Sequence, residues 1–171
     1  MRVKLLLLLL LLIGQQYLFA QFNRGKLQAT GLTCALCSNA INKSLEELPF
    51  VQSVKSILKE SAFEIQFKSG SLFNPDQVRE AVEDAGFFVG ELVLTGESSS
   101  IVVNENGLFQ WGNNSYHLVS SSLRQLNGKI HLRVINKSFL TDKAFKKISS
   151  LVSDSCSQSG QRIYHVQLVN P

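Results

Sequence analysis

The clearest pattern in the chain is an alternation of apolar and polar residues between positions 62 and 67. Phe63, Ile65 and Phe67 share one face of an extended segment, and a glutamate and a glutamine occupy the other. Successive side chains of a strand point to opposite faces of a sheet, so a period of two predicts a half-buried antiparallel strand. Shorter apolar stretches predict three more strands, at 26–30, 51–58 and 87–94.

Two segments between these strands have a helical period instead. Cys37, Ile41 and Leu45 recur at helical spacing, which predicts a helix over 37–48 that the following proline ends. The second helix has clear boundaries. Asn74 is suited to the N-cap, and Pro75 and Gly86 fit the first helical position and the C-terminal cap.

These elements follow one another in the order β-α-β-β-α-β over residues 24–95. That order is the ferredoxin-like plan, so we predict an α+β protein with a ferredoxin-like domain in this part of the chain. Residues 96–100, a Gly-Glu-Ser-Ser-Ser run, interrupt the periodicity and are the best candidate for a linker.

Residues 101–171 predict a second, smaller module of α+β type that is rich in strands. Its apolar stretches indicate a hairpin over 101–111, and strands at 116–119, 130–135 and 163–169. Thr141 can cap a helix that extends to about Val152. We expect this module to fold as a five-stranded barrel.

The first twenty residues have the anatomy of a secretory signal peptide. Two basic side chains precede an unbroken apolar run from Leu5 to Ile13, and Ala20 is a suitable cleavage position. The run is shorter than the roughly 20 residues of a transmembrane helix, which leaves an uncleaved membrane anchor as the alternative. We predict cleavage after Ala20, and export to the periplasm in a Gram-negative host or secretion in another.

Charge and missing motifs exclude several classes of function. Loss of Arg2 and Lys4 with the signal lowers the formal net charge from +4 to +2, and no segment clusters basic with aromatic residues, so no nucleic-acid partner is expected. No glycine-rich phosphate loop and no nucleophile elbow occurs. We therefore expect no enzyme and no small-molecule substrate. Three cysteines in an exported protein leave at least one unpaired or metal-bound.

The candidate chemistry is concentrated in the segment Gly31-Leu32-Thr33-Cys34-Ala35-Leu36-Cys37. Cys34 and Cys37 are two residues apart at the start of a predicted helix, where unpaired N–H groups and the helix dipole favour a thiolate. Thiolates select soft or borderline ions, and no His, Asp or Glu lies within five residues to complete a closed zinc site. Two sulfurs alone suit Cu(I), which accepts linear coordination.

This segment resembles the heavy-metal-associated domain, together with Ala40-Ile41 and the later Glu83-Asp84-Ala85-Gly86-Phe87. That family includes copper chaperones, the periplasmic mercury-binding protein and N-terminal modules of copper-exporting ATPases, and the resemblance covers roughly Lys26 to Leu94. It implies that Leu32, at a position where the family usually has Met, packs beneath the loop. It also implies that Phe87 covers the ion without donating to it.

The resemblance further implies a preference among ions. An acidic residue before the first cysteine shifts the family toward zinc, and this chain has Thr33 there. We therefore expect Cu(I) or Ag(I) over Zn(II), and Hg(II) is an alternative. The expected function is an exported carrier that uses Cys34 and Cys37 as its only ligands. It would pass the ion by ligand exchange to a metal-transporting membrane protein or another metal-binding protein.

Two further interpretations of the dithiol stay open: a thiol–disulfide oxidoreductase and a structural disulfide. Thiol–disulfide oxidoreductases also have a C-x-x-C pair at the start of a helix. A thioredoxin-like enzyme, however, has a Trp before the first cysteine and a later cis-proline, whereas this chain has Thr33 and no proline between Pro75 and Pro171. A bridge that closes so short a loop would stabilise the protein little.

All three histidines lie in the second module, with the third cysteine, Cys156. His117 and His165 each follow a tyrosine in a predicted strand, whereas His131 lies in another strand. If the tyrosine faces are buried, the alternation places both of these histidines outward, where neighbouring strands can bring them together. They are either ordinary surface histidines or an imidazole-rich site for Cu(II) or zinc.

Overall fold

A computed structural model describes residues 22–32, 35–152 and 162–170. The predicted signal peptide and Cys156 lie outside these residues. The strands are β1 (Phe22–Thr30), β2 (Val51–Ile57), β3 (Ala62–Phe67), β4 (Phe88–Val102), β5 (Leu108–Trp111), β6 (Asn114–Leu118), β7 (Gln125–Val134) and β8 (Ile163–Leu168). The helices are α2 (Ala35–Glu46), α3 (Pro75–Asp84) and α4 (Asp142–Ile148), with short 3₁₀ turns η1 (Leu58–Glu60), η2 (Lys137–Phe139) and η3 (Ser149–Leu151).

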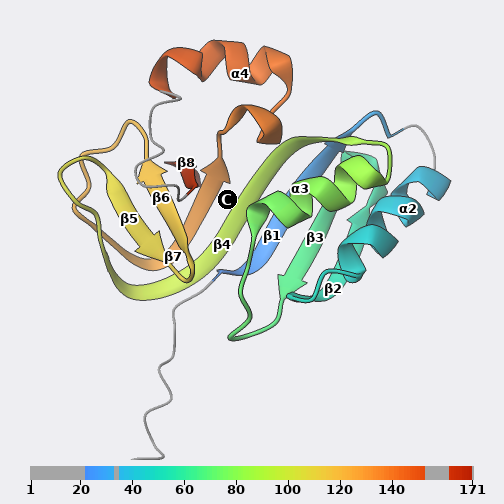
Figure 1. Cartoon of the computed structure of the whole chain (residues 1–171), viewed down its shortest axis with the longest axis horizontal. Helices are drawn as coiled ribbons and strands as arrows, with labels where there is room; N and C mark the ends of the chain where they lie inside the picture. Colours follow the sequence, from blue (N-terminus) through green and yellow to red (C-terminus); the bar gives the residue numbers. More distant parts are fainter. Residues whose placement is uncertain (1–21, 33–34, 153–161, 171) are drawn as a thin grey trace, which may run out of the picture.

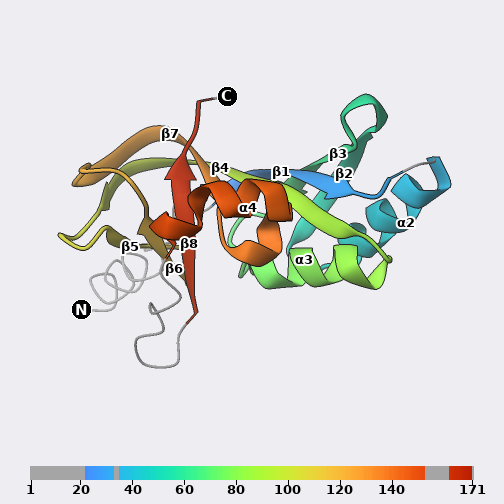
Figure 2. The same cartoon turned by 90° about the horizontal axis from the view of Figure 1, so that it is seen from above.

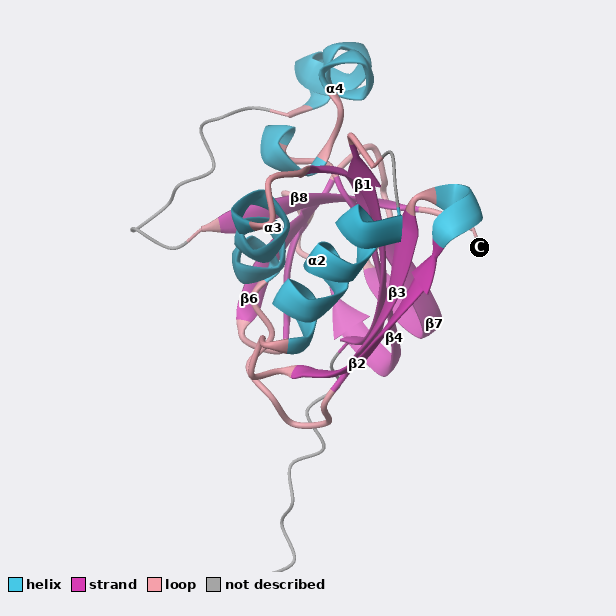
Figure 3. Ribbon diagram, turned by 90° about the vertical axis from the view of Figure 1, so that its right-hand side faces the viewer, coloured by secondary structure: helices cyan, strands magenta, loops and turns pink. Residues whose placement is uncertain are grey.

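The first half of the chain has the predicted β-α-β-β-α-β order, and its strands lie in the order β2-β3-β1-β4 (Figure 1). β1 is central and antiparallel to both neighbours, so that Leu27 lies opposite Phe63 on one side and Leu92 on the other. Helices α2 and α3 lie on the same side of these strands (Figure 3). The alternation in β3 is confirmed, since Phe63, Ile65 and Phe67 are buried and the residues between them are exposed.

The ends of α3 are formed as the sequence predicts. The Asn74 side chain accepts a hydrogen bond from the Asp76 N–H at 2.9 Å, and Pro75 opens the helix. At the other end Gly86 has a φ of +87°, its N–H donates to the Glu83 carbonyl, and the Phe87 N–H donates to the Val82 carbonyl. These two bonds form a Schellman motif, which turns the chain directly into β4.

The predicted linker at 96–100 is wrong, because these residues lie within β4, a continuous strand of 15 residues. Gly96 pairs with Ile130 of β7 and Ser98 with Gly128. The register shifts between Ser98 and Ile101, so the strand has an irregularity here but does not end.

The strands of the second half continue the same sheet and do not form the separate barrel expected. The eight strands follow the order β2-β3-β1-β4-β7-β8-β6-β5, and β8 is parallel to β6 (Figure 2). The predicted 101–111 hairpin is also wrong: β5 follows a turn at 104–107 but pairs with β6. Thr141 caps α4 as expected, although the regular helix ends at Ile148.

Side chains from the two halves pack against each other in one hydrophobic core. Phe22 of β1 lies 4.1 Å from Trp111 of β5, measured between ring centroids. The Tyr164 hydroxyl donates to a carboxylate oxygen of Asp76 at 2.8 Å, and the same oxygen accepts from Arg162 at 2.9 Å. Aromatic packing therefore joins β1 to the second half, and polar contacts of Asp76 join α3 to it. The division of the chain into domains at 24–95 and 101–171 stays a prediction.

In the part of the chain that the structure describes, every helix is too short or too polar to cross a membrane.

Candidate metal site

The segment 31–37, which we call the metal loop, begins where β1 ends. Gly31 has a φ of +86°, a left-handed conformation that glycine adopts without steric cost, and it turns the chain away from the strand. Leu32 is half-buried and packs against the main hydrophobic core. The expected contact beneath the loop is therefore present. Thr33 and Cys34 lie outside the described residues, so their role stays a prediction.

Cys37 lies in the first turn of α2 and is half-buried. Ile41, one turn further along the same face, is fully buried and fixes the rotation of the helix. Leu36 points the other way and is 79% exposed. Leu36 was not among the predicted site residues, although its position outside the apolar stripe of the helix indicates an exposed side chain.

Phe87 lies beside the metal loop because of the turn that ends α3. The Schellman motif at Gly86 directs the Phe87 ring toward Gly31, where a Cβ would lie 3.8 Å from the ring. Phe87 is half-buried and contacts the main core. The ring is therefore placed to shield one side of the loop with a surface that has no hydrogen-bonding group.

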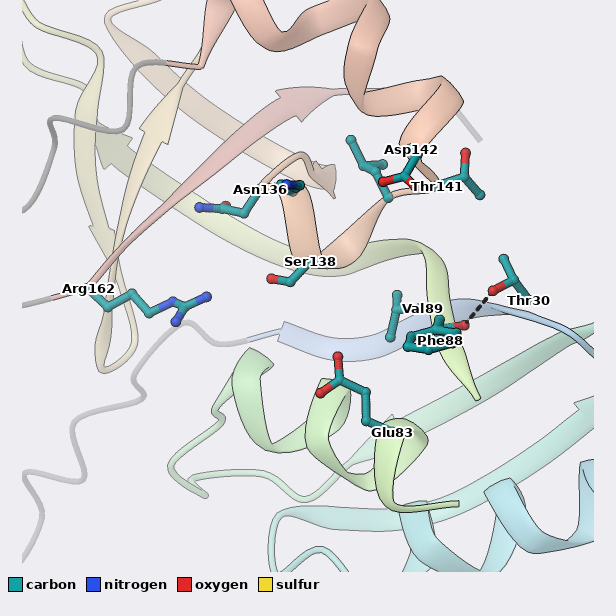
Figure 4. A pocket seen from close by; sticks show the side chains of 11 residues that line it. Thr30, Glu83, Phe88, Val89, Asn136, Ser138, Thr141, Asp142 and Arg162 are labelled. Atoms are coloured by element: carbon teal, nitrogen blue, oxygen red, sulfur yellow. Dashed lines mark hydrogen bonds between the residues drawn. The ribbon is translucent and has the colours of Figure 1, made fainter. Parts of the chain in front are cut away.

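A cleft of about 720 Å³ lies between the two halves of the molecule, beside the end of β1 and the start of β4 (Figure 4). The Thr30 hydroxyl, at the start of the metal loop, donates to the Phe88 carbonyl at 3.3 Å and forms one wall. Glu83 enters from α3, and Arg162 precedes β8 (Figure 4). Phe88 is 68% exposed and adds an apolar side chain to the lining. Sequence patterns could not reveal this cleft, because its walls are far apart in the chain.

The three histidines do not lie at the metal loop. His117 and His165 are brought together, as the strand pattern suggested, and their ring centroids are 5.1 Å apart. The expectation that both point outward is wrong for His165, which is only 4% exposed. His165 contacts Asn136 and the His117 ring, so a face opposite the buried tyrosines is not necessarily solvent-exposed. His131 lies apart on β7, where its Nδ1 is 2.9 Å from the Thr95 hydroxyl.

The first half of the chain is similar to a known family. Residues 26–88 match the model of the heavy-metal-associated domain. This part of the chain is a heavy-metal-associated domain, as its motifs indicated.

The relatives include two plant ATPases. The chain is 30% identical over 120 residues to the copper-transporting ATPase RAN1 of Arabidopsis thaliana, covering 70% of this chain and 11% of that protein. It is 35% identical over 95 residues to the cation-transporting ATPase HMA5 of Oryza sativa subsp. japonica, covering 56% of this chain and 9% of that protein. The chain thus spans about a tenth of the length of these relatives.

Among solved structures, the yeast copper transporter domain CCC2A, studied in its apo and Cu(I)-loaded states, is 28% identical and has a TM-score of 0.35. That alignment covers 38% of this chain and 88% of the other. A copper-binding domain from HMA7, a P-type ATPase, is 29% identical with a TM-score of 0.35, covering 38% of this chain and 86% of the other.

Proposed function

We propose that the protein is an exported carrier of a soft metal ion that binds Cu(I) between the thiolates of Cys34 and Cys37. One observation carries this proposal. Cys37 lies in the first turn of α2, inside the matched heavy-metal-associated domain and three residues after Cys34. Two thiolates on one turn converge on a single ion, and thiolates select soft ions.

The surroundings of the loop favour Cu(I) or Ag(I) over Zn(II). Three described side chains in or beside the loop are apolar: Leu32 and Phe87 pack against the core, and Leu36 faces solvent. A closed zinc site needs four ligands. Within the described ranges no three residues of the His, Cys, Asp and Glu types gather into a metal-binding group. Thr33 supplies only a neutral hydroxyl beside the first cysteine. Hg(II), which also binds two thiolates, is an alternative cargo.

Transfer of the ion follows from the unequal placement of the two cysteines. Cys34 precedes the helix and would meet an incoming thiolate or thioether first, whereas Cys37, on the helix, would hold the ion meanwhile. The intermediate has three ligands, and the ion then leaves with the partner after Cys34 and Cys37 dissociate in turn. The Phe87 ring limits access of water during this exchange, because it covers one side of the loop with an apolar surface.

The partner we propose is a metal-transporting membrane protein or another metal-binding protein. Relatives of this chain are copper-transporting and cation-transporting ATPases, which supports a place in metal traffic across membranes. The exposed side chains of Leu36 and Phe88 offer apolar contact to a docked partner. Export by residues 1–20 would place this exchange in the periplasm of a Gram-negative host, or outside the cell in another.

A competition titration tests the proposal. Reduced protein should take one equivalent of Cu(I) from a chromogenic chelator such as bicinchoninate, whereas Cys37→Ser should compete at least about tenfold less well because one thiolate is lost. Cys34→Ser should behave in the same way and should also fail to pass Cu(I) to an acceptor dithiol. Cys156→Ser is the matched control and should bind like the parent.

Parental affinity in either Cys34→Ser or Cys37→Ser would overturn the two-ligand model. Tighter binding of zinc than of Cu(I), after correction for buffer, would overturn the choice of ion. Rapid reduction of insulin by a protein that does not retain Cu(I) would instead identify a thiol–disulfide oxidoreductase.

A further inference from the structure

Two of the three histidines form a pair that the metal loop does not use. His117 of β6 and His165 of β8 occupy matching positions on adjacent parallel strands. Their ring centroids are 5.1 Å apart and the ring planes cross at 78°. Because side chains at matching positions leave the same face of a sheet, the pairing of the two strands fixes the separation of the rings.

The surroundings hold one ring in place and leave the other accessible. His165 is buried, its backbone N–H donates to the Asn136 side-chain oxygen at 2.8 Å, and its Nδ1 lies 3.5 Å from the Asn136 side-chain nitrogen. His117 is half-buried, and among the described residues its buried Nδ1 has no hydrogen-bond partner. A buried nitrogen without a partner is costly, which makes it a position where a ligand would be gained.

The separation of the rings matches that of two imidazoles on one tetrahedral ion. With metal–nitrogen distances of about 2.0–2.1 Å and a tetrahedral angle, the two ring centroids lie about 5 Å apart. A linear two-coordinate ion such as Cu(I) would place the centroids roughly 6 Å apart. The observed 5.1 Å is close to the separation for a tetrahedral ion.

We propose that His117 and His165 form a second metal site, which binds a divalent borderline ion of zinc type through one nitrogen of each ring. Water completes the coordination on the accessible side of His117. Coordination requires the neutral form of both imidazole rings. Nitrogen donors also differ in preference from the thiolates of Cys34 and Cys37, so the two sites would not compete for one ion.

Zinc titration of the purified Cys34→Ser/Cys37→Ser protein tests this site without interference from the metal loop. Calorimetry should show one equivalent of zinc bound at micromolar concentration, with shifts of the ring-nitrogen resonances of His117 and His165. His117→Gln should weaken binding at least tenfold. His131→Gln is the matched control, because His131 lies apart from the pair and contacts Thr95, and it should bind like the parent.

No bound zinc, together with unshifted ring resonances, would overturn the site. Equal weakening in His117→Gln and His131→Gln would overturn it too, because binding would then be unspecific. His165→Gln should also weaken binding, and circular dichroism should first show that it is folded. If burial of the glutamine unfolds that variant, the half-buried His117→Gln decides the matter.

Discussion

Two glycines, Gly31 and Gly86, shape the surroundings of the metal loop at the residue scale. Both have a positive φ, a conformation that costs other residues roughly 1–2 kcal/mol. Gly31 turns the chain out of β1, and Gly86 turns it out of α3 so that the Phe87 ring faces Gly31. The position of the Phe87 ring beside the loop therefore depends on both of these backbone turns.

The titration of His117 should be visible in the pH dependence of stability. Burial lowers its pKa from the ordinary 6.5, so below that value the unfolded state binds more protons than the folded state. The stabilising contribution is thus complete above pH 6.5 and is lost as the pH falls through the folded-state pKa. Protonation would also place a charge beside the His165 ring.

Urea unfolding of metal-free protein at about pH 7.5 and about pH 5 measures this contribution. The free energy of unfolding should fall less between the two conditions in His117→Gln than in the parent. A fall of the same size in both proteins would show that other groups cause the acid sensitivity.

At the scale of elements, α3 is the helix that joins the two halves of the molecule. Its N-cap, Asn74, accepts from the Asp76 N–H, and the Tyr164 hydroxyl of β8 lies 3.3 Å from the same Asn74 oxygen. Asp76 in turn accepts from Tyr164 and Arg162. A local capping signal in the sequence thus also serves a long-range contact.

Asn74→Ala should lower the free energy of unfolding by about 1 kcal/mol, because the cap bond to the Asp76 N–H is lost. Asn74→Ser keeps a capping oxygen and is the control, which should lose less. Urea unfolding followed by circular dichroism gives both values. Equal losses in the two variants would mean that the amide acts through Tyr164 and not through the cap.

Elements that depend on local patterns could be predicted from sequence, and those that depend on distant strands could not. The alternation of β3 and the caps of α3 are local, and the structure confirms them. Gly96 and Ser98 have the composition of a loop, but pairing with β7 holds them in a strand. His165 is buried by elements that its own strand pattern cannot reveal. The resemblance of the metal loop predicted the family, whereas the cleft beside it depends on the packing of both halves.

At the scale of the whole molecule, β4 and the common core make the two halves interdependent. The same strand pairs with β1 on one side and with β7 on the other. Phe22, at the start of the first half, packs against both Trp111 and Tyr116 of the second. Removal of either half would expose apolar side chains that the other now covers.

We therefore expect the protein to unfold in one cooperative transition. Trp111 is the only tryptophan, and its fluorescence reports the second half together with its contact to Phe22, whereas far-ultraviolet circular dichroism is dominated by α2 and α3 of the first. The two signals should have the same urea midpoint. Cu(I) bound at the metal loop should raise both midpoints together, and separate midpoints would indicate two independent domains.

The pairing of β4 with β7 also bears on how the protein avoids aggregation. A strand at the edge of a sheet exposes unpaired backbone groups that can recruit another chain. β4 would be such an edge if the sheet ended with the first half, but the observed order leaves β2 and β5 at its two ends. β2 carries Lys55, and a lysine on an outer strand discourages such pairing because its charge would have to be buried. The second half thus covers the β4 edge of the metal-binding half, so that this edge offers no unpaired backbone groups to another copy.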